Sequence, residues 1–267
     1  MTEQIERAEP LLSVCIPTYN FGAYIGEALE SILDQATAAC EVVVLDSGST
    51  DQTPQVVALL QRRHANLRYE RTEAPCGIDR DLARVVGLAR GQYCWLFSAD
   101  DVMVAGAIGA LLASLAEAHD VYVVQHSNDS YTMQPIESRH PVLRLDAATS
   151  FDLCDPKQQR RYFELAATTE AFFSFMGGLI IRRAAWDSRR LNEAFVGSCW
   201  AHVVRLFEVA EAGLRLRYLP RVLLRRRADN DSFATHGTVH RFALAIDGYL
   251  RIAEHFWGSR SEQAFHV

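Results

Sequence analysis

The chain of 267 residues has almost no lysine, no cysteine pair at metal-binding spacing and no excess of basic charge. Lys157 is its only lysine, so nearly all of its positive charge is arginine, the better bidentate partner for phosphate. The net charge of −6 argues against general binding of nucleic acid. None of the six cysteines forms a C-x-x-C pair, which excludes a zinc ribbon and predicts buried free thiols in a reducing compartment.

The sequence also lacks segments that would direct it to or across a membrane. Its first ten residues are polar and acidic, without the apolar stretch of a signal peptide. No apolar run approaches the roughly 20 residues needed to span a bilayer. Internal repeats and low-complexity tracts are absent. These absences predict a cytoplasmic protein with a single domain over residues 1–267.

Strand and helix patterns alternate through the first half. Short apolar runs predict buried strands at 11–17, 41–45, 67–70, 93–97 and 121–125. Apolar residues at helical spacing predict helices at 24–33, 78–89 and 104–117, and a further helix that Thr53 caps and Pro54 begins. Later segments predict helices at 156–166 and 200–212 and strands at 178–181 and 222–224. The alternation predicts an α/β fold with a mostly parallel, Rossmann-like central sheet flanked by helices.

The central predicted strand, 93–97, leads directly to the acidic pair Asp100 and Asp101. Ligands of open α/β sheets bind at the carboxyl ends of the strands. Two adjacent carboxylates repel each other unless a cation joins them, so the pair predicts a Mg²⁺ or Mn²⁺ site that holds a diphosphate. The alternative is that Asp101 only caps the helix predicted at 104–117, with Asp100 stabilising its amino end.

Polar side chains also follow the first two strands. Tyr19 is suited to stacking on a base or ribose, and Asp46 to accepting a hydrogen bond from a base. The loop 47–51 could direct backbone N–H groups at the ligand, or it is simply a tight turn. Right-handed crossovers would bring these residues and Asp100 to one edge of the sheet. The polar and aromatic residues gathered there predict a nucleotide site at that edge of the sheet.

Three segments resemble the successive signatures of family 2 glycosyltransferases: 13–20, 43–53 and 91–101. Their order and spacing agree over about the first half of the chain. The resemblance implies a GT-A fold and a nucleotide-sugar donor. It divides the domain into a donor-binding half at about 11–127 and an acceptor-binding half with a C-terminal helix at about 128–267.

The resemblance implies roles at matched positions. Asp100 and Asp101 would bind the metal, and Asp101 would also belong to the catalytic residues. The sequence departs from the family at Ser98, which stands where the metal-binding motif has its first acid, and Ala99 follows it. The residues expected to bind the nucleotide-sugar are Pro17, Thr18, Tyr19, Asn20, Asp46, Ser49, Asp51, Arg80, Ser98, Ala99, Asp100 and Arg227.

His202 is the expected catalytic base. The start of the predicted helix 200–212 carries an Asp base in most family members, and His202 falls at that position. A neutral imidazole can take a proton from a sugar hydroxyl near neutral pH. The alternative is a histidine that only hydrogen-bonds or contacts the acceptor.

A narrower resemblance links 78–81, 93–95, 197–203 and 230–233 to bacterial abequosyltransferases of O-antigen synthesis. It implies transfer of a hexosyl or deoxyhexosyl group to a polyprenyl-diphosphate-linked glycan, an O-antigen or other surface polysaccharide intermediate, with peripheral contact at the cytoplasmic face of the inner membrane. The apolar stripe at 242–256 predicts packing on the domain, with membrane docking as the alternative.

The segment 128–150 is polar and predicts an irregular lid or acceptor loop. His126, Asn128 and Asp129 would either face the sugar or be solvated loop ends.

Two other functions remain open. A sugar nucleotidyltransferase should carry a Gly-rich, basic loop after the first strand, and 18–22 has none. A non-catalytic nucleotide-sugar-binding protein would explain Ser98, Ala99 and His202 at usually acidic positions.

Overall fold

A computed structural model describes residues 9–230, 237–258 and 260–267. Its strands are β1 Leu12–Thr18, β2 Cys40–Asp46, β3 Leu67–Arg71, β4 Tyr93–Leu96, β5 Val102–Met103, β6 Val121–Asp129, β7 Pro135–His140, β8 Thr149–Asp152, β9 Leu179–Arg182 and β10 Arg215–Arg227. Its α-helices are α1 Ile25–Leu33, α2 Thr53–Gln61, α3 Ile78–Leu88, α4 Ala107–Leu115, α5 Pro156–Leu165, α6 Arg183–Asp187, α7 Ala201–Glu211, α8 Gly237–Phe256 and α9 Glu262–His266. Short 3₁₀ helices are η1 Thr169–Phe172, η2 Met176–Gly178 and η3 Glu193–Phe195.

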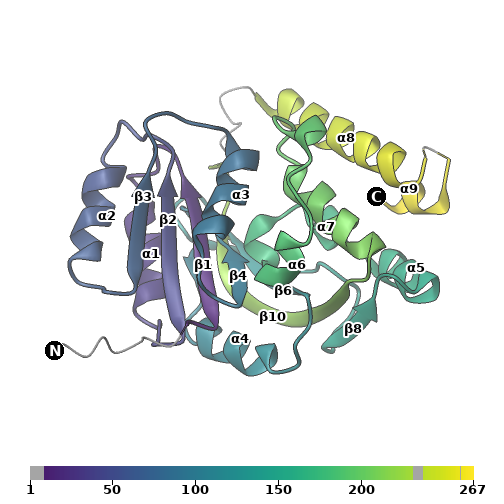
Figure 1. Cartoon of the computed structure of the whole chain (residues 1–267), viewed down its shortest axis with the longest axis horizontal. Helices are drawn as coiled ribbons and strands as arrows, with labels where there is room; N and C mark the ends of the chain where they lie inside the picture. The colour runs from purple at the N-terminus through teal and green to yellow at the C-terminus, as the bar shows by residue number, and fades with distance from the viewer. Residues whose placement is uncertain (1–8, 231–236, 259) are drawn as a thin grey trace.

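One sheet runs through the molecule in the order β3-β2-β1-β4-β9-β6-β10-β5, and β7 and β8 pair at its side with β6 and β10. β1 is parallel to β2 and β4, and β6 is parallel to β10. β9 lies antiparallel between β4 and β6. The predicted mostly parallel α/β sheet is confirmed, with the helices on both of its faces (Figure 1).

The central strands are buried on both faces, as their unbroken apolar runs predict. In β4, Cys94 packs on the face covered by α3 and α7, whereas Tyr93 and Trp95 pack on the face covered by α1, α2 and α4. Side chains of a strand alternate between faces, so one apolar run supplies both cores. This double burial fixes β4, and hence the residues that follow it, at the centre of the molecule.

Several predicted boundaries are wrong. The segment predicted to be irregular contains β7, and β6 continues to Asp129. The final strand covers 13 residues, not only 222–224. α4 begins at Ala107 because 102–103 pair with β10 as β5. Thr53 is the first residue of α2 and not its cap, and its N–H donates instead to Asp51 (2.9 Å).

The C-terminal stripe and the cysteines also differ in part from expectation. Tyr249 and Ala253 of α8 are buried, but Phe242, Ile246 and Leu250 are exposed. All six cysteines are free, and two of them, at positions 76 and 154, are exposed. In the part of the chain that the structure describes, no helix combines the length and apolarity needed to cross a membrane.

Asp79 joins the two halves of the chain. Its buried carboxylate accepts hydrogen bonds from the backbone N–H groups of Gly197 (2.8 Å), Cys199 (3.0 Å) and Ala201 (3.0 Å). These groups lead into α7, whose first N–H groups have no partners within the helix. A negative charge is also favoured at a helix amino end. Asp79 therefore fixes the start of α7, which carries His202, against α3.

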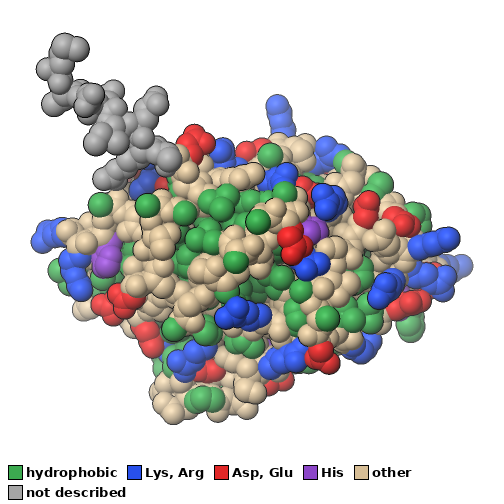
Figure 2. Space-filling view, turned by 90° about the horizontal axis from the view of Figure 1, so that it is seen from below, with side chains coloured by type: hydrophobic (Ala, Val, Ile, Leu, Met, Phe, Trp, Pro, Cys, Tyr) green, Lys and Arg blue, Asp and Glu red, His purple; other side chains and the backbone are tan. Residues whose placement is uncertain are grey.

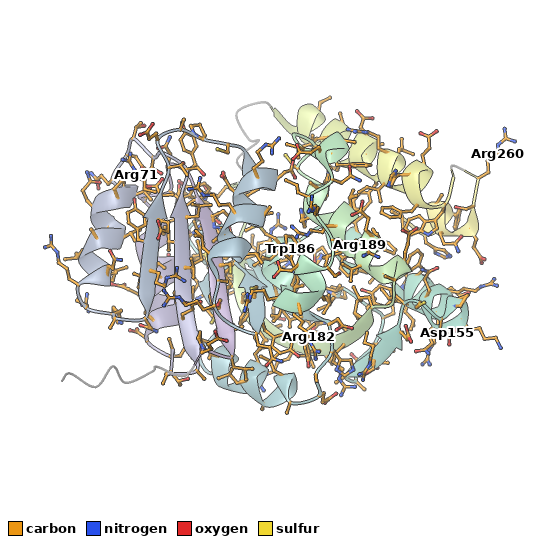
Figure 3. The ribbon with its side chains drawn as sticks, in the orientation of Figure 1. Arg71, Asp155, Arg182, Trp186, Arg189 and Arg260 are labelled. Carbon is orange, nitrogen blue, oxygen red and sulfur yellow. The ribbon has the colours of Figure 1, made fainter. Side chains whose placement is uncertain are left out.

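We expect Asp79→Ala to lower the free energy of unfolding by about 3 kcal/mol, because three buried N–H groups lose their acceptor. Asp79→Asn should lose less, since its amide oxygen can still accept. Urea denaturation followed by circular dichroism measures both. The control is Asp155→Ala at the outer end of α5 (Figure 3), where a carboxylate caps a helix at the surface by accepting from Lys157 (2.9 Å). Equal losses for Asp79→Ala and Asp155→Ala would contradict the role of Asp79.

Candidate active site at the carboxyl edge of the sheet

The ends of β1 and β2 lie side by side, with Thr18 opposite Asp46. Asp46 is fully buried. Its Oδ1 accepts from the Ser49 N–H (2.8 Å), and its Oδ2 accepts from the Tyr69 hydroxyl (2.5 Å) and lies 3.4 Å from Arg71 Nε. Arg71 lies at the end of β3 (Figure 3). Asp46 is thus held in one orientation beneath the loop that follows β2.

The loops after β1 and β2 are tied to each other. Asn20 has a positive φ of 59°; its N–H donates to Ser49 Oγ (2.9 Å), and its Oδ1 accepts from the Thr50 N–H (2.8 Å). Asp51 accepts from the N–H of Gly22 (2.8 Å), where a Cβ atom would lie 2.7 Å from a backbone nitrogen of α2. These contacts give Asn20, Ser49 and Asp51 a structural role in shaping the edge.

The other residues predicted to bind the donor at this edge differ in their exposure to solvent. Tyr19 is 44% exposed, so its ring is free for stacking. Pro17 and Ala99 are buried. The hydroxyl of Thr18 is buried and has no hydrogen-bond partner. A buried hydroxyl without a partner is unusual, and Thr18 therefore offers a polar group to a ligand.

Asp100 is held by polar partners on both of its oxygens. Ser98 Oγ donates to Oδ1, and Asn230 Nδ2 donates to Oδ2 (2.8 Å). Asn230 belongs to the segment 230–233 of the narrower resemblance, and residues 231–233 of that segment lie outside the described residues. The carboxylate and the Ser98 hydroxyl form a set of hard oxygen donors, the kind that Mg²⁺ and Mn²⁺ prefer.

Asp101 points to β10 rather than to α4. Its Oδ1 accepts from the backbone N–H of Arg227 (2.9 Å), and the residue before α4 is Gly106, so the alternative of a helix cap is wrong. Burial, followed by the charge of Asp100, raises the pKa of Asp101 to about 8. Two adjacent buried acids therefore need positive charge nearby, which fits the divalent ion that the sequence predicts.

Arg227 provides part of that charge. Its Nε donates to the backbone oxygen of Asp100 (3.0 Å), its Nη1 to that of Tyr131 (2.6 Å), and its Nη2 to Glu27 (2.5 Å). The guanidinium also lies over the Tyr24 ring, 5.2 Å from its centroid. All of its nitrogens thus have protein partners. Sequence reasoning missed Glu27 and Tyr131, because no local pattern links them to residue 227.

Arg80, Asn128 and Asp129, the last two considered as either sugar-facing residues or solvated loop ends, are engaged with protein partners. Arg80 forms an exposed ion pair with Glu193 of η3 (2.6 Å). Asp129 is buried and forms an ion pair with Arg225, and Asn128 donates to Glu137 (2.7 Å). These are contacts between secondary-structure elements, in place of the solvated loop ends considered from the sequence.

His202 lies in the first turn of α7 and is buried. Its Nε2 is 3.1 Å from the backbone oxygen of Phe173, to which it donates, and its Nδ1 has no partner. Burial lowers the pKa of His202 to about 4, against the opposing charge of Asp79. The imidazole is therefore neutral at neutral pH, with its lone pair on Nδ1. Within the described residues, no hydrogen bond or ion pair joins His202 to Asp100.

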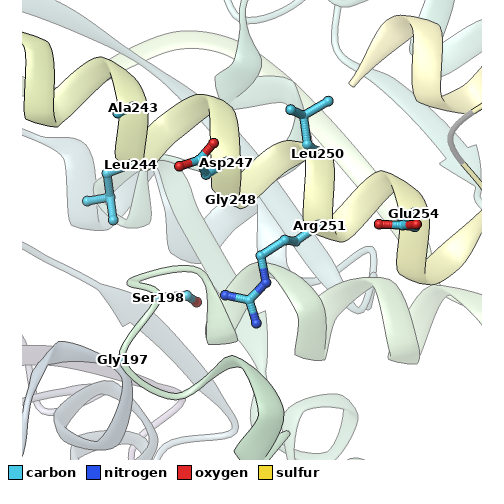
Figure 4. Close-up of a pocket in the computed structure, with 9 residues that line it drawn as sticks. All are labelled: Gly197, Ser198, Ala243, Leu244, Asp247, Gly248, Leu250, Arg251 and Glu254. Carbon is cyan, nitrogen blue, oxygen red and sulfur yellow. The ribbon is translucent and has the colours of Figure 1, made fainter.

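A surface pocket of about 530 Å³ lies elsewhere, between α8 and the turn before α7 (Figure 4). Its lining includes Ser198, Asp247, Arg251 and Glu254, and none of the residues predicted to bind the donor. The face seen from below Figure 1 carries charges of both signs around a central group of hydrophobic side chains (Figure 2). No stripe of one charge covers that face.

Residues 13–186 match the protein family described as "Glycosyl transferase family 2". This match covers more than half of the chain, which therefore belongs to glycosyl transferase family 2 and is a nucleotide-sugar-dependent glycosyltransferase. The resemblance stated from the sequence is confirmed, and the nucleotidyltransferase and non-catalytic alternatives are set aside.

Two relatives match nearly the whole chain. The abequosyltransferase RfbV of Salmonella typhimurium is 28% identical over 252 residues, which are 92% of this chain and 75% of RfbV. The "GalNAc(5)-diNAcBac-PP-undecaprenol beta-1,3-glucosyltransferase" of Campylobacter jejuni is 24% identical over 246 residues, 92% of this chain and 74% of that protein.

Solved structures show the same fold. TarS of S. aureus in complex with UDP has a TM-score of 0.67 at 18% identity, over 96% of this chain and 68% of the TarS chain. The mannosyltransferase PcManGT from Pyrobaculum calidifontis, in complex with GDP-Man and Mn²⁺, has a TM-score of 0.61 at 19% identity, over 91% of this chain and 64% of PcManGT. The predicted GT-A fold is confirmed.

The low pKa of His202 predicts a pH dependence of stability. In the unfolded chain the imidazole titrates near pH 6.5, so between pH 6.5 and 4 the unfolded state binds the proton and the folded state does not. Stability that is present at pH 7 is thus lost as the pH falls through this window, by about 3 kcal/mol for this residue.

We expect His202→Gln, which keeps a donor for Phe173 but does not titrate, to flatten the fall in stability between pH 6.5 and 4. Urea midpoints at half-unit pH intervals measure the two slopes. The titrating groups that the two proteins share contribute equally to both slopes, so the difference between the slopes comes from residue 202. Identical slopes in the two proteins would show that His202 is accessible to protons in the folded state.

Proposed function

We propose that this enzyme transfers a hexosyl or deoxyhexosyl group from a nucleotide-sugar at the carboxyl edge of the sheet to a hydroxyl of a polyprenyl-diphosphate-linked glycan. The observation that supports the donor site best is the meeting of Asp46, Asp100 and Asp101 at one edge of a GT-A sheet. Ligands of such sheets bind beyond the carboxyl ends of the strands.

In this proposal the nucleoside lies over the ends of β1 and β2. The exposed ring of Tyr19 stacks on the base or ribose, and Thr18 supplies its unpartnered hydroxyl. Asn20 and Ser49 shape the loops around the base. Arg71, which lies half-exposed beside Asp46, adds positive charge near the donor.

Asp100, Asp101 and Ser98 would hold Mg²⁺ or Mn²⁺ through oxygen atoms, as their chemistry favours. When bound, that ion would neutralise the donor diphosphate and stabilise it as the leaving group. The complex of PcManGT with GDP-Man and Mn²⁺ supports this choice of metal. Arg227 would act by positioning: its contacts hold the Asp100 backbone and the Asp101 carboxylate in place.

His202 would accept the proton of the acceptor hydroxyl at Nδ1, the nitrogen that has no partner. Its Nε2–H bond to Phe173 fixes that tautomer. The negative charge of Asp79 favours the imidazolium that forms, which partly offsets the cost of burial. Release of the diphosphate then accompanies bond formation at the anomeric carbon.

The acceptor is the finer part of the proposal. The Campylobacter jejuni relative is named for a diphosphate-undecaprenol-linked substrate, and RfbV for abequosyl transfer. On α8, the exposed side chains Val239, Phe242, Ile246 and Leu250 recur every three or four residues and form one apolar stripe. Such a stripe supports peripheral contact with the cytoplasmic face of the inner membrane, where a lipid-linked acceptor would lie.

The donor site is tested by Asp100→Asn. The ligands are UDP, GDP, CDP, dTDP and their nucleotide-sugars. We expect one nucleoside diphosphate and its nucleotide-sugar to raise the Tm of the unmodified protein in the presence of Mn²⁺. Asp100→Asn should lose the Mn²⁺-dependent part of that rise and lower donor turnover by at least about 100-fold, because the ion no longer holds the diphosphate. Asp155→Asn, remote from this edge, is the control. A full Mn²⁺-dependent shift in Asp100→Asn would contradict the assignment.

The base is tested by His202→Gln at pH 7.5, where both proteins are folded. We expect the nucleotide-dependent rise in Tm to be unchanged and transfer to fall by about 10²- to 10⁴-fold, since a positioned base contributes about that much. Radiolabelled sugar transfer to a lipid extract measures the rate. Transfer within a factor of a few of the parent would assign His202 a packing role only.

A further inference from the structure

A second cluster of ionisable side chains lies outside the residues predicted to bind the donor. His126 comes from β6, His140 ends β7, and Glu170 lies in η1. One possible ligand atom of each lies within 4.8 Å of the other two. His126 Nδ1 is 3.6 Å from one Glu170 oxygen, and His140 Nε2 is 3.7 Å from the other.

These separations suit the ligands of one metal ion better than a hydrogen-bonded network. Both are longer than a hydrogen bond of good geometry. Two ligand atoms bound to tetrahedral Zn²⁺ at about 2.0–2.1 Å lie about 3.3 Å apart. Each of the two distances, which run to different Glu170 oxygens, is within about 0.4 Å of that value. The three ligand atoms as a set lie within 4.8 Å of one another, so they would have to approach by up to about 1.5 Å to bind one ion.

Three buried polar atoms of the cluster, on His126 and Glu170, lack hydrogen-bond partners. His126 is completely buried, and neither of its ring nitrogens has a hydrogen-bond partner; the Oε2 atom of Glu170 is also buried without one. Buried groups of this kind are rare unless a water or an ion serves them. Burial, followed by the charge of His140, lowers the pKa of His126 to about 3, so its imidazole is neutral and has the free lone pair that a metal requires.

The neighbours of His140 orient it as metal-bound histidines are oriented. Its Nδ1 lies 2.9 Å from Glu137 Oε2, to which it donates, and Asn128 Nδ2 also donates to that oxygen (2.7 Å). The lone pair of His140 then lies on Nε2, the nitrogen that faces Glu170. A carboxylate behind the imidazole is the usual outer partner of a metal-ligating histidine.

We propose that His126, His140 and Glu170 bind a Zn²⁺ ion that fastens the β6–β7 hairpin to η1. Two imidazoles and one carboxylate are a zinc ligand set that leaves a fourth position for water or substrate. The site is distinct from the oxygen-only site at Asp100, because imidazole ligands favour Zn²⁺ over Mg²⁺. In the β6–β10 ladder, Arg227 pairs with Asp129. His126 lies three residues before Asp129 on β6, about 10 Å away along the strand.

One neighbouring charge opposes the ion. The Arg226 guanidinium lies over the Phe175 ring, 5.7 Å from its centroid, and the Phe175 ring centroid is 4.6 Å from that of His126. The charge of Glu170 offsets that of Arg226. Burial raises the pKa of Glu170 to about 6, which still leaves the carboxylate mostly ionised at neutral pH. We therefore expect weaker binding than in a four-ligand structural zinc site.

The test is metal binding by the full chain, which does not depend on glycosyl transfer. Cys76→Ser and Cys154→Ser remove the exposed thiols, which also bind zinc. After treatment with EDTA and its removal, the protein is titrated with Co²⁺ and followed by visible absorption, and then with Zn²⁺ in competition. We expect one Co²⁺ per chain in a non-octahedral site, its displacement by Zn²⁺ but not by Mg²⁺, and a higher Tm with Zn²⁺.

The variants distinguish this site from others. Glu170→Gln and His140→Ala should each weaken Co²⁺ binding at least 10-fold, and Glu137→Gln, which loses only the outer partner, should weaken it by about 10- to 100-fold. Asp100→Asn should bind Co²⁺ as the parent does. Circular dichroism checks that each variant is folded, and Glu170→Gln preserves the shape of the side chain. The proposal is overturned if the parent binds no Co²⁺, if Glu170→Gln and His140→Ala bind it with the affinity of the parent, or if Asp100→Asn abolishes binding.

Discussion

Arg227, at the end of β10, contacts Asp100 and Asp101, the acidic pair that follows the central strand β4. Its backbone N–H binds the Asp101 carboxylate, and its side chain binds the Asp100 backbone and Glu27. Without a neighbouring cation, two adjacent buried carboxylates would repel each other and take up protons. Burial and the charge of Asp100 still raise the pKa of Asp101 to about 8, so the arginine offsets only part of this repulsion. Its contacts leave the side-chain oxygens of Asp100 to Ser98, Asn230 and any incoming ion.

The donor half could be predicted from the sequence because its information is local. The run 93–97, shortly before Asp100, is apolar or aromatic at every position, as a strand buried on both faces requires. Polar residues end each parallel strand, and parallel strands direct their carboxyl ends to one edge. The pairing of Thr18 with Asp46 follows from that rule. What local patterns could not provide was the partner of each acid: Asp46 is held by Tyr69 and Arg71, and Asp101 by a backbone group 126 residues later.

The second half of the chain was predicted less well because its strands depend on distant partners. Every residue of β7 is exposed or half-buried and most are polar, so β7 has no apolar signal of its own. It forms because β6 offers its free side. β9 is antiparallel because it enters between β4 and β6 from the other end of the sheet. The resemblance also singled out Arg80, whereas its neighbour Asp79 makes the buried contacts to α7.

Protein partners satisfy some of the buried polar groups of the described residues and not others. At the donor edge each acid has protein donors, so the edge is already ordered before a ligand arrives, and binding there has little conformational entropy to lose. By contrast, the Thr18 hydroxyl, both ring nitrogens of His126 and the free nitrogen of His202 have no protein partner. Unpaired buried groups are costly to folding, and a protein retains them where a ligand or a proton completes them.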